Sequence, residues 1–103
     1  MKTIVVLFNL SPHADEAIYE DWARTVDIPN ARRLDGCSDF RVLRVKGLLG
    51  SDDKPPFSYC ELIEVDDMEA FEEVVKSEAM QAVAAQFQQF AANPIFMVSE
   101  SLT

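Results

Sequence analysis

Histidine, cysteine and glycine are all scarce in this sequence, which has one histidine, two cysteines and three glycines. The one histidine, His13, cannot build a multi-histidine metal site and is poorly placed for a Ser-His-Asp triad. The chain has no glycine-rich phosphate loop, no G-x-S-x-G elbow and no HExxH motif. Cys37 and Cys60 have no partner at metal-ligand spacing, so we interpret both as buried thiols and expect neither a disulfide framework nor a metal site.

Positive charge is also scarce, because nine Lys and Arg residues stand against 18 Asp and Glu residues and leave a net charge of −9. Phosphate binding needs clustered basic side chains, so this balance argues against nucleic acid and against an anionic membrane surface. No run approaches the roughly 20 apolar residues of a membrane span. Residues 1–3 lead into a strand-like stretch without a secretory signal, so we expect a cytoplasmic protein.

Hydrophobic residues are abundant, at 49% of 103 residues, which suits one folded domain over residues 1–103. Apolar runs predict four strands, and apolar residues at helical spacing predict two helical regions between them. The order is strand, helix, strand, strand, helix, strand, which is typical of the ferredoxin-like α+β fold. The predicted strands are about 3–10, 38–46, 57–65 and 95–101.

Local signals set the expected limits of the first helix. Ser11 followed by Pro12 predicts an N-cap and a first helical position. Pro29 predicts an end near Arg24 or Thr25, because the residue before a proline resists helical geometry. The predicted inner face of this helix comprises Ala14, Ala17, Ile18, Trp22 and Thr25.

Similar signals set the limits of the second helical region. Asp66 is the expected N-cap, since Glu69 three residues later would complete a capping box. Ser77 is expected to restart the helix after a short break. The helix then continues to Ala92, where Asn93–Pro94 stops it.

The strand over residues 2–10, KTIVVLFNL, is apolar on both faces. A sheet in a small domain usually leaves one face for water and alternates accordingly. This chain has helices enough to cover one face only. We therefore expect a second copy to cover the other face, which gives a homodimer of the dimeric α+β barrel type.

Glu61 is a charged residue in the middle of an apolar strand, where it shares a face with Tyr59. A buried carboxylate is costly unless it is paired, and burial raises its pKa, so Glu61 in a cavity is a candidate acid or base. The alternative is an ion pair with Arg41 or Arg44, because the neighbouring strand offers an arginine on each face. Tyr59 is a candidate hydrogen-bonding residue or a core aromatic.

Other polar and aromatic residues are further candidates for a pocket where the misplaced polar side chains meet. Asn9 and Ser99 can bind either a substrate or a loop amide. Trp22 is either core filling or a stacking platform for a planar ligand. Asp27 follows Trp22 and is either a solvated turn residue or a carboxylate at the mouth of the pocket.

The stretch 22–36, WARTVDIPNARRLDG, resembles the W-x4-[HD]-x-P-x4-L-x-G pattern that follows the first helix in dimeric α+β barrel proteins. The stretches SPHADEAIYEDWARTVDIP, KGLLGSDDKPPFSYCELIEV, AMQAVAAQFQQF and NPIFMVSE resemble the REDY-like family. The resemblance implies a small, cofactor-independent dimer of secondary metabolism. Its relatives steer reactive pyrrole, indole or carbazole intermediates toward dehydration, cyclisation or condensation. Many barrel relatives have a histidine where this chain has Asp27, which argues against a histidine-based mechanism.

Residues and resemblance together predict a cofactor-independent cyclase or dehydratase acting on a pyrrole- or indole-type intermediate of prodigiosin-like pigment biosynthesis. Two alternatives stay open: a non-catalytic protein that binds and protects such an intermediate, and a cofactor-free monooxygenase. The expected catalytic residues are Asp27, Glu61 and Tyr59, and the expected substrate-binding residues are Trp22, Phe8, Asn9, Arg41, Arg44 and Ser99.

Overall fold

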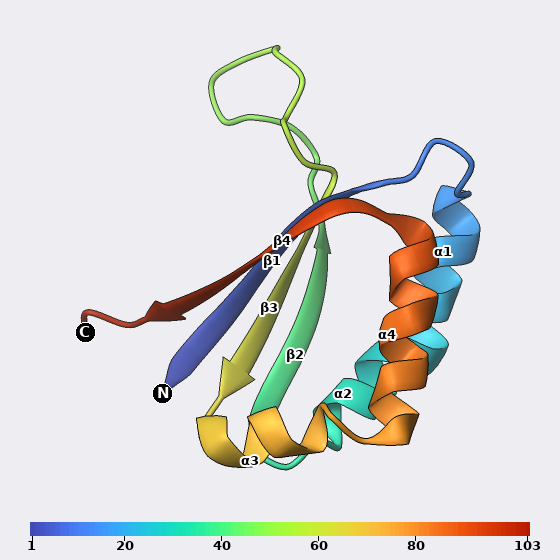
Figure 1. Cartoon of the computed structure of the whole chain (residues 1–103). Coiled ribbons are helices and arrows are strands. Elements are labelled where there is room, and N and C mark those ends of the chain that lie inside the picture. Colours follow the sequence, from blue (N-terminus) through green and yellow to red (C-terminus); the bar gives the residue numbers. More distant parts are fainter.

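The computed structural model describes all 103 residues and contains one four-stranded antiparallel sheet (Figure 1). Its strands are β1 (Lys2–Leu10), β2 (Cys37–Arg44), β3 (Tyr59–Val65) and β4 (Ala91–Glu100). They lie in the order β2-β3-β1-β4, which confirms the predicted ferredoxin-like α+β fold. β2 ends two residues before its expected end, and β3 begins two residues after its expected start, so the loop between them is longer than expected.

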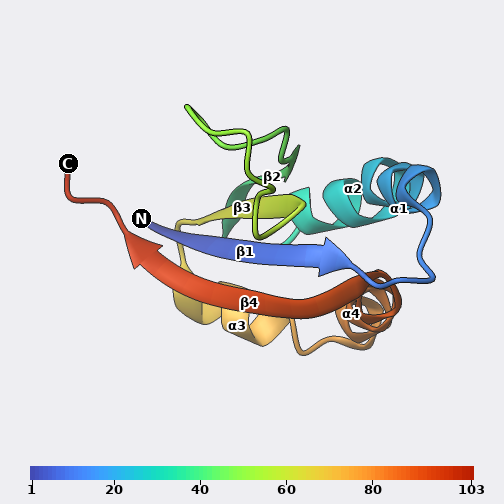
Figure 2. The same cartoon turned by 90° about the horizontal axis from the view of Figure 1, so that it is seen from above.

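The helices are α1 (Glu16–Trp22), the π-helical turn η1 (Ala23–Asp27), α2 (Ile28–Arg32), α3 (Met68–Val74) and α4 (Glu78–Phe90). Helices α1, α2 and α4 lie on one side of the sheet, and α3 lies near the end of the sheet where β3 stops (Figures 1 and 2). None of these helices is long and apolar enough to cross a membrane.

Helix α1 begins at Glu16, so the expected start after Ser11 is wrong. The side chain of Asp15 accepts a hydrogen bond of 3.0 Å from the backbone N–H of Ile18 and thereby caps the helix. Ser11 and Pro12 instead belong to the connection that leaves β1. An aspartate N-cap is as favourable as a serine N-cap, so the local sequence alone did not decide between them.

The inner face of α1 also differs from the expected one. Tyr19 is fully buried, whereas Ile18 is 62% exposed. Ala23 and Asp27 are buried as well, so residues at a spacing of four face the sheet along α1 and η1. Of the expected face, Ala17, Ile18 and Thr25 point to solvent, whereas Trp22 is half-buried and packs against the core.

The first helical region continues past Pro29, so the expected end near Arg24 or Thr25 is wrong. The backbone N–H of Ile28 donates to the carbonyl oxygen of Ala23, five residues earlier, which defines a π-helical turn. A π-helical turn inserts one residue into the helix and breaks the usual i to i−4 pattern. Pro29, which has no N–H to donate, comes after this turn in the first turn of α2, where a proline is tolerated.

The second helical region confirms the break that was expected at Ser77, whose side chain accepts a 3.3 Å hydrogen bond from the N–H of Met80. The expected cap of the preceding helix is off by one residue. Asp67 caps α3 by accepting a 3.1 Å hydrogen bond from the N–H of Ala70, and Asp66 lies outside the helix.

Helix α4 ends at Phe90, two residues earlier than expected, and β4 begins without a loop. Ala91 is already paired with Leu10 of β1, so strand pairing overrides the helical preference of the alanines. Asn93 has a φ of 47°, and Pro94 comes next within β4. A proline is acceptable there because β4 is an edge strand.

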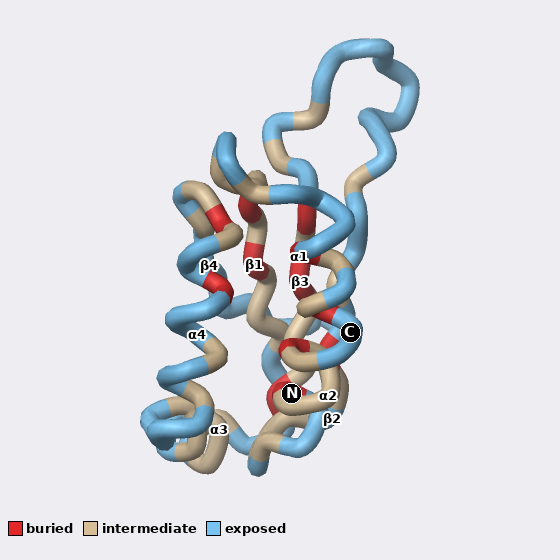
Figure 3. The backbone as a smooth tube through the Cα atoms, turned by 90° about the vertical axis from the view of Figure 1, so that its right-hand side faces the viewer, coloured by how far each residue is buried: buried red, intermediate tan, exposed pale blue.

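Aromatic side chains form the core between the sheet and the helices. The ring of Phe8 stacks on that of Tyr59 with centroids 5.5 Å apart. Tyr19 meets Tyr59 edge to face at 5.0 Å, and Phe87 meets Phe8 in the same way at 5.0 Å. Among the strands, the buried segments gather on the central pair, β1 and β3 (Figure 3). This core fixes α1 and α4 against the sheet.

The opposite face of the sheet carries no helix and is largely apolar. Leu43, Ile95 and Met97 are each 40–44% exposed on this face, and Val5 and Leu7 between them are half-buried. The strand register makes them neighbours, since Leu7 pairs with Ile95 and Val5 pairs with Met97. We call this surface the bare sheet face.

Gly36, in the connection between α2 and β2, holds the start of α3 in place. Its φ is +83°, and its carbonyl oxygen accepts a 2.9 Å hydrogen bond from the N–H of Asp66. A Cβ atom at this position would collide with the carbonyl oxygen of Asp67 and lie 2.8 Å from the backbone nitrogen of Phe71. Only glycine therefore fits both the backbone conformation and the close approach.

We expect Gly36→Ala to lower the free energy of unfolding by about 2–4 kcal/mol, because it adds left-handed strain to a backbone collision. Gly50→Ala is the matched control, since Gly50 has a φ of +75° and open space around it. The control should cost only about 1 kcal/mol. Urea unfolding of both variants measures the difference, and equal losses would contradict the role given to the close contact.

Candidate active site

A cavity of about 310 Å³ lies between the helix-bearing side of the sheet and helices α2, α3 and α4. This volume is near the lower end of the roughly 300–1,000 Å³ range of ligand pockets. Twelve of its 15 lining residues are hydrophobic, and the polar ones are Asp27, Glu61 and Gln88. The hydrophobic lining consists of Ile4, Ala31, Leu34, Phe40, Ile63, Phe71, Val75, Met80, Val83, Ala84, Phe87 and Phe96.

Asp27 is the last residue of the π-helical turn η1, and it lines this cavity. Its side chain is buried, with 7% of the residue exposed. Loss of hydration penalises the charged carboxylate, which raises the pKa of Asp27 from 3.8 to about 6. Asp27 is therefore a buried carboxyl group, and the alternative of a solvated turn residue is wrong.

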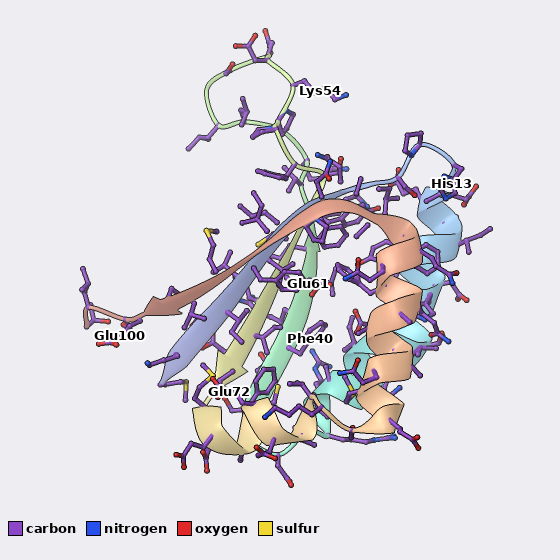
Figure 4. All side chains as sticks on the ribbon, viewed as in Figure 1. His13, Phe40, Lys54, Glu61, Glu72 and Glu100 are labelled. Atoms are coloured by element: carbon purple, nitrogen blue, oxygen red, sulfur yellow. The ribbon has the colours of Figure 1, made fainter.

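Glu61 reaches the same cavity from the middle of β3. It points to the helix side of the sheet, together with Tyr59 and Ile63 (Figure 4). The residue is 5% exposed, and its Oε2 atom has no hydrogen-bond partner. Burial, and then the nearby charge of Asp27, raises the pKa of Glu61 from 4.5 to about 8.

The alternative of an ion pair between Glu61 and a strand arginine is wrong. Arg41 pairs in register with Leu62, the residue after Glu61, so it lies on the bare sheet face and is exposed. Arg44 lies on the helix side, but its Nε atom donates to Glu20 Oε2 at 2.7 Å. The cavity lining contains no Lys, Arg or His, so no cation offsets its two carboxyl groups.

The two carboxyl groups differ in protonation at neutral pH. With a pKa of about 6, Asp27 is mostly ionised near pH 7, whereas Glu61, with a pKa of about 8, is mostly protonated. An ionised and a protonated carboxyl in one cavity can act as a base and an acid in the same reaction. No group of three or more His, Cys, Asp or Glu side chains gathers where it could hold a metal ion.

Tyr59 lies in a separate hollow of about 240 Å³ beside the cavity. Its hydroxyl donates to Glu20 Oε2 at 2.8 Å, and the same carboxylate is held by Arg44. The hydrogen bonds from Arg44 and then Tyr59 lower the pKa of Glu20 from 4.5 to about 2. The structure thus places Tyr59 and Arg44 in a network centred on Glu20, away from the two cavity carboxyls.

Trp22 and Phe8, two of the expected substrate-binding residues, do not line the cavity. Trp22 lies where α1 meets α4, and its Nε1 atom donates to Gln86 Oε1 at 2.6 Å. Its ring also packs against Phe90, with centroids 5.3 Å apart. Phe8 is fully buried in the aromatic core. Both residues hold the helices against the sheet, as in the core-filling alternative for Trp22.

Asn9 and Ser99 are hydrogen-bonded to the protein rather than directed into the cavity. The Asn9 side chain donates to the carbonyl oxygen of Pro56 at 2.9 Å and accepts from the hydroxyl of Ser58 at 2.9 Å. The Ser99 hydroxyl donates to the carbonyl oxygen of Thr3 at 2.7 Å. Both therefore match the loop and backbone alternative.

Tyr19 is a polar residue of the interior that the sequence interpretation missed. It lines the smaller hollow, and its hydroxyl is buried without a hydrogen-bond partner. Burial raises its pKa, and the charges of Glu61 and Asp27 raise it further. The spacing of Tyr19, Ala23 and Asp27, each four residues apart, was the available signal, but the expected inner face excluded it.

The β2-β3-β1-β4 sheet is antiparallel and has helices on one side, which defines a ferredoxin-like α+β protein. Two carboxyl groups lie in an apolar cavity in its interior. The model of a family described as REDY-like protein HapK matches residues 2–102, so the chain belongs to this family. No curated protein matches the chain at a significant level.

Solved structures show the same fold. The chain is similar to HapK from Hahella chejuensis, with a TM-score of 0.79 and 24% identity over 99% of this chain and 93% of that chain. It is similar to SnoaB, a cofactor-independent oxygenase from Streptomyces nogalater, with a TM-score of 0.74 and 19% identity over 99% and 93% of the two chains. A dimeric ferredoxin-like protein of unknown function from Thermobifida fusca gives a TM-score of 0.73 and 11% identity over 97% and 90%.

We expect the free energy of unfolding to fall as the pH rises. In the folded state the pKa of Asp27 is raised from 3.8 to about 6 and that of Glu61 from 4.5 to about 8, so the folded protein holds protons that the unfolded chain has lost. Stability should be highest at about pH 4 and should decrease up to about pH 8. Glu61→Gln should remove most of this decrease and raise stability near pH 9 by roughly 2–4 kcal/mol.

Urea unfolding of the wild type and of Glu61→Gln, each measured across this pH range, tests the effect. Glu72→Gln is the control, because Glu72 is an exposed residue of α3 (Figure 4). Parallel pH profiles for the wild type and Glu61→Gln would show that the carboxyl of Glu61 is not desolvated as described.

Proposed function

We propose that this chain is a cytoplasmic, cofactor-independent cyclase or dehydratase of secondary metabolism, acting on a reactive pyrrole- or indole-type intermediate of prodigiosin-like pigment biosynthesis. The proposal rests on one observation: two carboxyl groups, Asp27 and Glu61, line one apolar cavity that offers them no cationic partner. Membership of the REDY-like HapK family supports the class of substrate.

The cavity walls suit a flat, apolar ring. The aromatic side chains of Phe40, Phe71, Phe87 and Phe96 line it from four different elements. Aromatic rings favour stacked or edge-to-face contacts with another ring, and they exclude water from the reacting groups. Loss of water from a reactive heterocycle is favoured in such a site, because bulk water would otherwise add back to the product.

Asp27 and Glu61 together supply both proton transfers of a dehydration. The carboxylate of Asp27 accepts a proton from a ring N–H or C–H, and the freed electron pair forms the new double bond. The carbon–oxygen bond then breaks, and the acid form of Glu61 delivers its proton to the departing hydroxyl, which leaves as water. The reaction ends with Asp27 protonated and Glu61 ionised, and proton exchange restores the first state.

We further propose that two copies pair through the bare sheet face. This face is broad and apolar, and the register places its side chains side by side across all four strands. A domain of this size buries a modest share of its surface when alone, so a second copy adds apolar burial. The protein from Thermobifida fusca, which shares the fold and is described as dimeric, supports the proposal of a dimer.

The acid–base roles predict a bell-shaped dependence of turnover on pH. Activity should be greatest near pH 7, with limbs near pH 6 and pH 8 that reflect Asp27 and Glu61. Asp27→Asn and Glu61→Gln should each lower kcat by about 10²–10⁴-fold. Turnover of a hydroxylated bipyrrole, monitored by its absorbance and by product mass, measures both effects.

Asp21→Asn is the matched control for Asp27→Asn, because Asp21 is an exposed residue of α1. Wild-type turnover from folded Asp27→Asn and Glu61→Gln proteins would contradict the proposed roles. Binding of the bipyrrole with no change in product would identify a protecting protein instead of an enzyme. Stoichiometric consumption of oxygen would identify a monooxygenase.

Sedimentation velocity tests the proposed dimer. At micromolar concentration the wild type should sediment as a dimer, and Met97→Glu should sediment as a monomer, because it places a charge on the bare sheet face. Ile18→Glu is the control, since Ile18 is exposed on α1, on the other side of the sheet. A monomeric wild type, or a Met97→Glu protein that stays dimeric, would contradict pairing through this face.

A further inference from the structure

Two buried polar side-chain atoms have no hydrogen-bond partner, namely the hydroxyl of Tyr19 and Oε2 of Glu61. Leaving a buried polar group unsatisfied costs about 1–3 kcal/mol, so each of these atoms calls for an explanation. The mechanism proposed above gives the carboxyl group of Glu61 a role, but it does not explain why the Oε2 atom lacks a hydrogen-bond partner. It gives no role at all to Tyr19.

The two atoms belong to elements that face each other. The ring of Tyr19 packs on that of Tyr59, with centroids 5.0 Å apart, and Glu61 lies two residues further along the same face of β3. Four residues of a helix advance by about 6 Å, and two residues of a strand advance by about 6.6 Å. The step from Tyr19 to Ala23 along the helix is therefore close in length to the step from Tyr59 to Glu61 along the strand.

Ala23 and Asp27 continue the buried helix face that begins at Tyr19. The charges that act on the Tyr19 hydroxyl agree with this placement. The charge of Glu61 has the largest effect, and that of Asp27 comes second, ahead of Tyr59 and Glu20. The hydroxyl thus lies at the partition between the smaller hollow and the cavity.

Both orphaned groups are hydrogen-bond donors near neutral pH. Burial raises the pKa of Tyr19 above its ordinary value, which keeps its O–H, and Glu61 is protonated because its pKa is about 8. Two neutral donors in a dry site stabilise an oxygen atom on which negative charge develops, and they need no reorganisation when the charge appears.

We propose that Tyr19 and Glu61 form a two-donor subsite that receives a single oxygen atom of the substrate. The substrate class is then a planar heterocycle that carries a carbonyl or hydroxyl oxygen on or next to its ring. This inference rests on the function proposed above and adds Tyr19 as a substrate-binding residue. When Asp27 takes a proton from the ring, the freed electron pair forms the new double bond. The electrons of the breaking carbon–oxygen bond move to this oxygen, which both donors hold until Glu61 transfers its proton to it.

Paired probes test the subsite. Pyrrole-2-carboxaldehyde carries the required oxygen, and 2-methylpyrrole has a similar shape without it. NMR titration of the wild type should show tighter binding of the aldehyde by about tenfold or more, and Tyr19→Phe should lose about tenfold of that preference. The infrared carbonyl stretch of the bound aldehyde should lie at lower frequency in the wild type than in Tyr19→Phe.

Tyr59→Phe is the matched control, because Tyr59 is an equally buried tyrosine whose hydroxyl already donates to Glu20. It should leave the preference for the aldehyde unchanged and lower the melting temperature of the ligand-free protein. Tyr19→Phe should leave that melting temperature unchanged or raise it, since it removes an unsatisfied hydroxyl. A purely structural Tyr19 would show the opposite pattern.

An unchanged aldehyde preference in Tyr19→Phe would overturn the subsite and leave the roles of Asp27 and Glu61 standing. A wild type that does not prefer the aldehyde would overturn it in the same way, provided that Asp27→Asn and Glu61→Gln abolish bipyrrole turnover. If the wild type binds neither probe and turns over no bipyrrole, both the subsite and the proposed function are wrong.

Discussion

Two carboxyl groups share an apolar cavity that contains no positively charged side chain, and the organisation of this protein depends on that constraint. An unpaired buried carboxylate is costly, so the interior favours the protonated form of each group. The energetic cost of one charge is raised further by the presence of the other, which separates their protonation near neutral pH. The absence of a cation from the cavity therefore matters as much as the residues that line it.

The surrounding structure keeps cations away from that cavity. Arg44, on the same face of the sheet as Glu61, is held by the carboxylate of Glu20, which also accepts a hydrogen bond from the Tyr59 hydroxyl. Arg41 lies on the bare sheet face, and the sheet itself separates it from Glu61. Glu20 therefore satisfies the one arginine that could neutralise the interior acid, although nothing in the sequence around Glu20 distinguishes it from other acidic residues of α1.

Much of the fold could be predicted from the amino-acid sequence, but less of the candidate site could. The order of apolar segments was enough to predict the sheet. Glu61 was suspect because it interrupts an apolar strand, and Asp27 because it follows Trp22 and comes just before Pro29. The inner face of α1 was not predictable from local signals, since both Ser11 and Asp15 are good caps and the π-helical turn shifts the pattern beyond it. Strand pairing, a tertiary effect, likewise decided that Ala91 leaves the helix.

The π-helical turn at Ala23–Asp27 contains one inserted residue, and this insertion sets the direction in which the Asp27 side chain points. That direction therefore depends on the number of residues in the turn and not on their types. One residue fewer in this turn would restore ordinary winding and rotate the upstream part of the helix by about 100° relative to the downstream part. Deletion of one codon in this turn would therefore abolish the proposed acid–base chemistry while both Asp27 and Glu61 are retained. An alignment of relatives must therefore place the inserted residue correctly before an acidic residue of another protein is equated with Asp27 of this chain.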